Sequence, residues 1–170
     1  MKVICSYCRK NMGDKEPYDS SDISHGMCRR CLDDYEQKWA EQTLGELLDK
    51  FENPVLAVNS EARIVAANCA MAELLQKASR EIFGLLGGEA IECQFAQLPD
   101  RCGGTIHCKA CVIRNTVMYT MKTGKAKKNV PASLDGLTKN VDFVISTRKE
   151  ENYILLEINE VVAMKEKLRR

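Results

Sequence analysis

Four of the nine cysteines in this 170-residue chain stand in two CxxC pairs near its N-terminus. Two residues separate Cys5 from Cys8, and Cys28 and Cys31 repeat that spacing after nineteen intervening residues. Two such pairs are typical of a structural zinc site, because each tight turn brings two thiolates to one ion. A segment of about 39 residues buries too little apolar surface to fold unaided. We therefore predict a zinc ion bound by Cys5, Cys8, Cys28 and Cys31.

A second group of cysteines lies in the middle of the chain, around the sequence CGGTIHCKAC at residues 102–111. Its members follow one another with eight, five and two intervening residues: Cys93, Cys102, Cys108 and Cys111. Two glycines after Cys102 allow the backbone to turn back toward the later thiols. Cys108 and Cys111 are expected on one face near the N-terminus of a helix, where backbone N–H groups stabilise a thiolate. We predict that the four cysteines form one functional site.

Three interpretations of the second group stay open on the sequence alone. Four converging thiolates can hold an iron–sulfur cluster or a second zinc ion, although the spacing matches no standard metal motif. A thiol–disulfide switch would pair Cys108 with Cys102 or Cys93, and inert cysteines would fill space. His107 is a candidate accessory ligand, including for a non-covalently bound haem. A covalently attached haem is disfavoured, because the last cysteine of the group is followed by Val112 and not by a histidine.

Charge and composition narrow the classes of partner. The formal net charge is +1, and residues 1–39 carry seven Lys or Arg and seven Asp or Glu. This balance disfavours nucleic acid as the main partner. No apolar run approaches the roughly 20 residues that a membrane span needs, and MKVICSYCRK lacks the apolar region of a signal peptide. We predict a cytoplasmic protein without membrane contact, where abundant cysteines indicate metal or redox chemistry.

Motifs of familiar catalytic sites are missing from the sequence. We find no P-loop, H-E-x-x-H motif, nucleophile elbow or kinase motif. With two histidines in the chain, acid–base or phosphotransfer chemistry based on histidine has few candidate groups. We predict that the protein is not an enzyme.

Hydrophobic periodicity predicts the elements that must position the thiols. A helix is expected over residues 33–53, with an apolar stripe of Leu44, Leu47, Leu48 and Phe51. The later expected elements are a hairpin at 55–67, a helix capped by Asn68, a longer helix over 109–125, strands at about 126–134, 140–149 and 152–161, and a helical tail at 161–170. Antiparallel strands on either side of a block of helices indicate an α+β fold.

The segment of about residues 42–160 resembles a PAS domain. The residues that carry the resemblance are NPVLAVNSEARIVAAN, NCAMAELLQ, REIFG and VDFVISTRKEENYILLEINEV. The resemblance implies a PAS-like five-stranded antiparallel sheet with helices on one face, and a cavity between them for small ligands or cofactors. It also places the second cysteine group on the wall of that cavity.

The first segment resembles the short four-cysteine zinc-binding module found beside sensory domains in bacterial signal-transduction proteins. CSYCRK and SHGMCRRC carry this resemblance. It implies a signalling context and a protein signalling partner, with no catalytic activity. The expected organisation is a four-cysteine zinc-binding module at 1–39, a linker helix at 40–53, a PAS domain at 54–160 and a C-terminal helical tail at 161–170.

These observations predict a cytoplasmic sensory or regulatory protein that senses redox state or a small ligand. The alternatives are a transcription-regulatory or nucleic-acid-binding protein that uses the zinc finger, and a small electron-transfer protein that carries an iron–sulfur cluster. We also predict a homodimer, formed through the helix at 40–52 and the tail at 161–170. The apolar stripe on that helix would need a partner surface.

Overall fold

The computed structural model describes residues 1–166, and for residues 37–42 it describes the helical backbone without the side chains. The chain divides into two compact units, Met1–Thr43 and the residues from Leu44 onward. Helix α1 (Arg29–Leu48) contains the point of division. Within the described residues, no helix combines the length and the apolar character needed to cross a bilayer.

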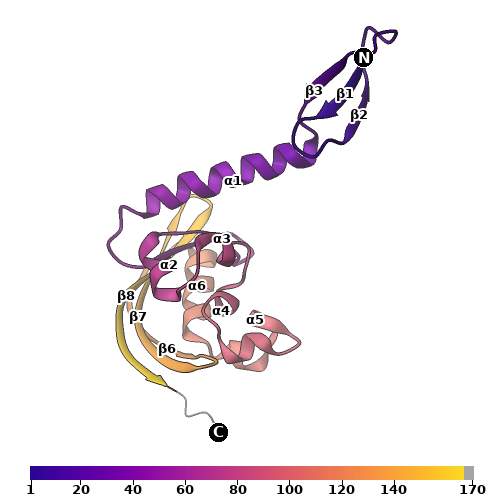
Figure 1. Cartoon of the computed structure of the whole chain (residues 1–170). Helices are drawn as coiled ribbons and strands as arrows, with labels where there is room; N and C mark the ends of the chain where they lie inside the picture. Colours follow the sequence, from indigo (N-terminus) through magenta and orange to yellow (C-terminus); the bar gives the residue numbers. More distant parts are fainter. Residues whose placement is uncertain (167–170) are drawn as a thin grey trace. The chain divides into compact units, whose positions relative to one another are not determined.

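The first unit is built on a small three-stranded sheet with the order β2-β1-β3 (Figure 1). Its strands are β1 (Lys2–Cys5), β2 (Asn11–Asp14) and β3 (Ile23–Gly26). Strand β1 is antiparallel to β2 and parallel to β3. The sequence analysis did not predict these strands, since four-residue strands give almost no periodic signal. The sheet matters because β1 ends at Cys5 and so fixes the first cysteine of the module.

The second unit contains a five-stranded antiparallel sheet with the order β5-β4-β8-β7-β6. Its strands are β4 (Val55–Val58), β5 (Ile64–Ala67), β6 (Lys127–Asp135), β7 (Lys139–Glu150) and β8 (Tyr153–Glu166). The first strand of the unit, β4, therefore pairs with its last strand, β8, in the middle of the sheet. The predicted α+β class and the five-stranded antiparallel sheet are confirmed.

Short helices cover one face of this sheet (Figure 1). They are α2 (Cys69–Leu75), α3 (Ser79–Ile82), α4 (Gly87–Ala90), η1 (Gln94–Gln97), α5 (Arg101–Gly104), η2 (Ile106–Lys109) and α6 (Val112–Thr123). Leu56 and Ile145 of the sheet pack in one core with Met71, Ile82 and Val117 of the helices. The helices on one face that the sequence predicted are thus present, and they form the main core.

The opposite face of the sheet is covered by the end of α1 and the segment after it. Val55 and Ala57, which alternate with the residues that face the helices, pack there with Leu48 and Phe51. Leu44 joins the same cluster. Most of the apolar stripe that was predicted to mediate a dimer therefore packs against the sheet of its own chain. The homodimer stays a prediction, and its support no longer comes from this stripe.

The C-terminal tail differs from the expectation at the residues where the structure describes it. Residues 161–166 were expected to be helical, and they instead continue strand β8. Met164 pairs with Val141, and Glu166 pairs with Lys139. Pairing with the preceding strand β7 overrides the local preference of these residues. Residues 167–170 of the predicted tail lie outside the described residues.

A buried pair of hydroxyl groups joins helix α6 to the sheet. Thr120 Oγ1 and Thr147 Oγ1 are 2.7 Å apart, and Thr120 Oγ1 also donates to the carbonyl oxygen of Lys125 at 3.0 Å. Both threonines are almost fully buried. A hydroxyl left without a partner in such a place carries its full desolvation penalty.

We expect Thr120→Val to lower the free energy of unfolding by about 2 kcal/mol and Thr147→Val by about 1 kcal/mol. The double variant should lose less than the sum, because neither hydroxyl is then orphaned. Urea unfolding of the full chain measures all three. Thr123→Val, on the exposed side of the same helix, serves as the control and should change stability by less than about 0.5 kcal/mol. Strict additivity of the two core substitutions would contradict the role given to this pair.

Candidate metal and thiol sites

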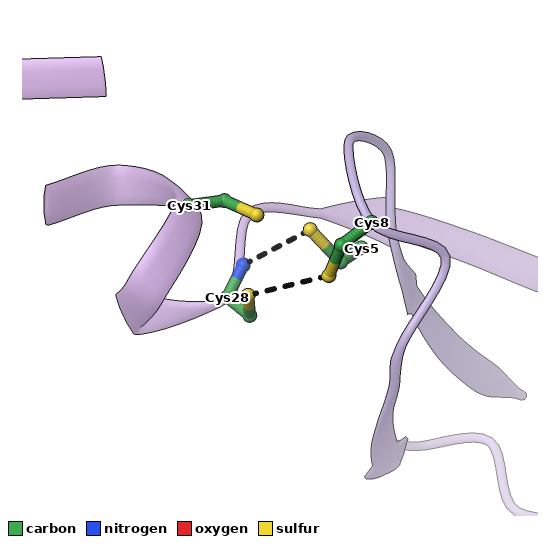
Figure 2. Close-up of side chains that lie close together, drawn as sticks. All are labelled: Cys5, Cys8, Cys28 and Cys31. Atoms are coloured by element: carbon green, nitrogen blue, oxygen red, sulfur yellow. Dashed lines mark hydrogen bonds between the residues drawn. The ribbon is translucent and has the colours of Figure 1, made fainter. Parts of the chain in front are cut away.

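The four N-terminal cysteines come together at one point of the first unit. The sulfur atoms of Cys5, Cys8, Cys28 and Cys31 all lie within 4.8 Å of one another, and Figure 2 shows them facing a common centre. The sulfur atoms of Cys8 and Cys28 are 3.7 Å apart. Zinc bound tetrahedrally at about 2.3 Å from each sulfur requires sulfur atoms roughly 3.8 Å apart. The four-cysteine cluster predicted from the sequence is confirmed, and its dimensions suit a metal ion of this size.

The local fold explains how these cysteines meet. After Cys5 ends strand β1, the chain turns back, with the N–H of Arg9 donating to the Cys5 carbonyl and the N–H of Cys5 to the Lys10 carbonyl. The second pair straddles the start of helix α1, so that Cys31 lies in its first turn. The N–H of Cys28 donates to the sulfur of Cys5 at 3.4 Å (Figure 2). One pair thus comes from a strand end and the other from a helix start.

Hydrogen bonds within this cluster shift the pKa values of Cys5 and Cys31 in opposite directions. Hydrogen bonds from the backbone N–H groups of Cys28 and Cys8 lower the pKa of Cys5 to about 6. A side-chain hydrogen bond with Cys28 raises the pKa of Cys31 to about 12. Four thiols this close cannot all ionise without a cation among them. A divalent metal ion would replace their protons, so metal binding here should release protons and weaken as the pH falls.

The second cysteine group lines a cavity between the sheet and the helices of the second unit. The cavity has a volume of about 730 Å³, and Cys93, Cys102, Cys108 and Cys111 all contribute to its wall. Most of the other lining residues are apolar, among them Leu56, Leu86, Ile91, Phe95, Ile113, Val117 and Phe143. Ligand pockets of small molecules have volumes of about 300–1,000 Å³ and a similar lining.

Cys108 has the most polar surroundings of the four. Its sulfur accepts a hydrogen bond from the N–H of Gly103 at 3.1 Å and lies 3.2 Å from Thr105 Oγ1. Burial is the largest single influence on this thiol and opposes its charge. The hydrogen bonds from Thr105 and Gly103, together with the positive charge of Arg114, outweigh it and hold the pKa of Cys108 below its ordinary value. Cys108 is therefore suited to exist as a thiolate.

Cys102 differs from Cys108 in its electrostatics. Burial raises the pKa of the Cys102 thiol, and the negative charge of nearby Cys108 adds to this effect. Helix α4 approaches Cys102 closely at Gly88, where an added Cβ atom would lie 2.7 Å from the Cys102 sulfur and 3.5 Å from Cys93 Cβ. An ion pair of 2.6 Å between Arg101 and Glu89 holds the same loop to α4. The second group thus combines a thiol whose pKa is lowered with one whose pKa is raised.

One detail of the predicted second site needs correction. Cys108 was expected to share a face of the long helix with Cys111, but it lies in the preceding 3-10 turn η2. The helix begins only at Val112, and Cys111 caps it by accepting a hydrogen bond from the N–H of Arg114. Helix formation is resisted here because the chain must fold back over the cavity. The candidate ligand His107 stacks on Phe95, with ring centroids 3.9 Å apart.

A preformed metal centre is not apparent in the second group. Among the described residues, the N-terminal cluster is the only set of three or more Cys, His, Asp or Glu ligand atoms that lie within 4.8 Å of one another. All four cysteines of the second group are free thiols. The structure brings them to one cavity and separates their sulfur atoms around its wall, so a cluster or zinc ion at Cys93, Cys102, Cys108 and Cys111 stays an untested prediction.

Sequence reasoning missed Thr105 and Arg114, which both act on Cys108. Thr105 precedes Cys108 by three residues, which is the spacing at which a hydroxyl can reach the sulfur across a single turn. That spacing could have indicated Thr105 as a hydrogen-bond partner of Cys108. Arg114 approaches through the bend at Gly103, where φ is +95°, and no local pattern would have revealed this contact.

Comparison with solved structures identifies the fold. The chain is similar to the LOV protein of Rhodobacter sphaeroides, with a TM-score of 0.50 and 14% identity over 75% of this chain and 68% of that chain. It also resembles the PAS domain of nitrogen regulation protein NR(II) from Vibrio parahaemolyticus, with 14% identity, a TM-score of 0.43 and coverage of 69% and 96%. The PAS domain of an HTR-like protein from Haloarcula marismortui shows 13% identity, a TM-score of 0.43 and coverage of 74% and 99%.

The match to the LOV protein confirms the PAS-like fold predicted from the sequence, and at 14% identity it shows the fold alone. No protein-family model matches the chain, and no curated protein matches it.

Proposed function

We propose that this protein is a sensory or regulatory protein, and that its PAS-like unit reads redox state through the thiols on its cavity wall. The observation that carries the proposal is the setting of Cys108. Its sulfur accepts a hydrogen bond from the N–H of Gly103 and shares a second with the hydroxyl of Thr105. It also lies near the charge of Arg114 and faces a cavity that three further cysteines line. A thiolate that is reachable through a cavity and has neighbouring thiols is suited to reversible disulfide chemistry.

A small disulfide, such as glutathione disulfide, would act as the oxidant of the cavity thiols. The Cys108 thiolate attacks one sulfur of the disulfide, forms a mixed disulfide and releases a small thiolate. The thiol of Cys102 or Cys93 then loses its proton, attacks the Cys108 sulfur and releases the second small thiolate. Two protein thiols are oxidised, one small disulfide is reduced to two thiols, and two protons leave the protein.

The structural effect of such a disulfide would reach the sheet through helix α6. Cys108 and Cys111 flank the last residues before this helix, and α6 packs against β6, β7 and β8. A disulfide within the loop would remove the thiolate that Gly103 and Thr105 hold and would shorten the connection to the helix. Either change biases the position of α6 on the sheet, which is what a two-state sensor needs.

For the first unit we propose that the metal is zinc and that its role is structural. Four cysteine ligands leave no open coordination position, which is typical of sites that stabilise a fold. We assign no catalytic role to either unit, and we propose a cytoplasmic location and a protein signalling partner. A reducing compartment would keep the second cysteine group reduced until an oxidant appears.

The proposal predicts that Cys108 reacts faster than the other cavity thiols at low pH. Iodoacetamide labelling of the full chain between pH 5.5 and 8.5, followed by peptide mass spectrometry, measures the rate at each cysteine. An ordinary thiol loses its thiolate as the pH falls below about 8.5, whereas Cys108, with its lowered pKa, should keep reacting to lower pH. Thr105→Val should move its profile toward higher pH.

The redox role has its own readout. Treatment with glutathione disulfide should give an intramolecular disulfide that contains Cys108, with a mass loss of about two protons that dithiothreitol reverses. Cys69→Ser, which removes an exposed cysteine outside the cavity, should leave this reaction unchanged. Labelling of Cys108 that follows the same pH profile as Cys93, with no disulfide formed, would reject the proposal.

A further inference from the structure

Arg114 places a guanidinium group on the wall of an otherwise apolar cavity. It lies in the first turn of α6, is half-buried and lines the same cavity as the thiols. Its side chain crosses the bend at Gly103 so closely that a Cβ atom there would lie 2.5 Å from Arg114 Nη1. Gly103, with a φ of +95°, leaves room for the guanidinium at this bend.

The guanidinium has no carboxylate partner among the described residues. No ion pair or hydrogen bond of its side chain is found there, and the groups it acts on are the thiols of Cys102 and Cys108. Two acidic residues also line the cavity, Asp135 and Asp142. Asp142 accepts a hydrogen bond from the hydroxyl of Ser133, and neither carboxylate is paired with Arg114. The neighbouring thiols offer this cation a negative charge only when they are ionised, so a carboxylate that enters the cavity would be stabilised beside it.

We propose that the cavity binds a small amphipathic carboxylic acid, whose carboxylate pairs with Arg114 and whose apolar body lies among the apolar residues of the wall. This inference rests on the proposed sensory role of the cavity and names the class of molecule it would sense. A guanidinium matches a carboxylate through two parallel hydrogen bonds. One cation in an apolar cavity suits a singly charged carboxylate better than a doubly charged phosphate, because the second charge would stay uncompensated.

The volume of the cavity is consistent with this class of ligand. About 730 Å³ is ample for an acid with eight to ten carbon atoms and lies within the usual range of about 300–1,000 Å³ for ligand pockets. Val117 and Ala132 contribute apolar surface from the helix side and the sheet side. An unbranched or aromatic hydrocarbon body would bury in the cavity the apolar surface that is otherwise exposed to water.

Isothermal titration calorimetry of the full-length reduced protein with octanoate and 3-phenylpropanoate tests the proposal. We expect binding to the unsubstituted protein and a loss of roughly 10- to 100-fold in affinity in Arg114→Met, since a hydrogen-bonded charge pair contributes about 1.5–3 kcal/mol. Lys122→Met makes the same kind of change at the other end of α6 and should bind like the unsubstituted protein. 1-Octanol, which lacks the charge, should bind Arg114→Met and the unsubstituted protein equally.

Two further variants keep the test decisive. Ala132→Phe should fill the cavity and weaken octanoate and octanol together, which separates binding in the cavity from binding elsewhere. If Arg114→Met fails to fold by circular dichroism, Arg114→Lys keeps the charge without the paired hydrogen bonds and should lose part of the affinity. Absence of acid binding at millimolar concentration, or equal binding by the Arg114 variants, overturns the inference.

The outcomes also separate this inference from the proposed redox function. Reversible disulfide formation at Cys108 without acid binding would leave the redox proposal standing and reject the ligand. Acid binding that depends on Arg114, in a protein whose Cys108 forms no disulfide, would support the ligand and reject the redox proposal.

Discussion

Replacing Cys28 by serine is expected to abolish metal binding by the first unit and to unfold it, while the second unit stays folded. Cys28 provides one of four sulfur atoms within 4.8 Å of one another, and its N–H also donates to the sulfur of Cys5. Structural zinc contributes about 10–16 kcal/mol of apparent binding free energy in small zinc-finger peptides at neutral pH. The three short strands of the first unit have no comparable apolar core to replace it.

Elemental analysis of the purified full-length chain measures the metal, and hydrogen exchange resolved by peptide measures the folding of each unit. We expect one tightly held zinc ion per chain, lost in Cys28→Ser together with protection in residues 1–36. Protection in the five-stranded sheet should persist, because its core lies within the residues from Leu44 onward. Cys69→Ser is the matched control and should keep both metal and protection. An unsubstituted protein that holds no metal would refute this prediction.

Replacing Asn68 by alanine is expected to lower the free energy of unfolding of the second unit by about 3 kcal/mol. Asn68 is 1% exposed and sits where the end of α1, strand β4 and helix α2 meet. Its Oδ1 accepts hydrogen bonds from the N–H groups of Val55 and Met71, at 2.9 and 3.0 Å. The side-chain amide donates to the carbonyl oxygens of Leu48, Phe51 and Asn53 at 3.4, 3.2 and 2.8 Å. Alanine would leave several of these backbone groups buried without a partner.

Urea unfolding of the full chain, followed by circular dichroism, measures the effect. Asn115→Ala is the matched control, since Asn115 is exposed and its amide makes one hydrogen bond, to the Lys109 carbonyl. It should cost less than about 1 kcal/mol. Asn68→Asp keeps the acceptor but loses the donors and buries a charge, so it should be at least as destabilising as alanine. Equal effects of the substitutions at positions 68 and 115 would show that the buried network contributes little.

Much of the fold follows from local patterns in the sequence. The apolar run Val55–Val58 and the cap at Asn68 predicted the hairpin and the helix that follow each other at the start of the second unit, and both are present. The alternating residues at 140–149 and 152–161 likewise mark β7 and β8. These signals are reliable because side-chain direction repeats every two residues in a strand, and because a cap bonds to residues within one turn.

The sequence predicted the structure less well where a local pattern competes with contacts that form only in the folded chain. The helical tail expected at 161–166 is a strand, because β7 offers it backbone partners. The stripe of Leu44, Leu48 and Phe51 was assigned to a partner chain, and it packs on the chain's own sheet. In both cases the local pattern allowed two outcomes, and a contact that forms only in the folded sheet decided between them. The stripe packs on β4 and on Leu155, and the tail pairs with β7.

The sequence by itself determined the four-cysteine cluster of the first unit, because a CxxC turn brings its own two sulfur atoms together and a second pair completes the set. Only the tertiary structure shows the surroundings of the second cysteine group. Its thiols are spread around a cavity, and what distinguishes Cys108 is the approach of Gly103, Thr105 and Arg114. Ligand spacing is a local property that can be read along the chain. The pKa of a buried thiol depends on every charge and donor that packing brings within a few ångströms, and only the folded chain defines those neighbours.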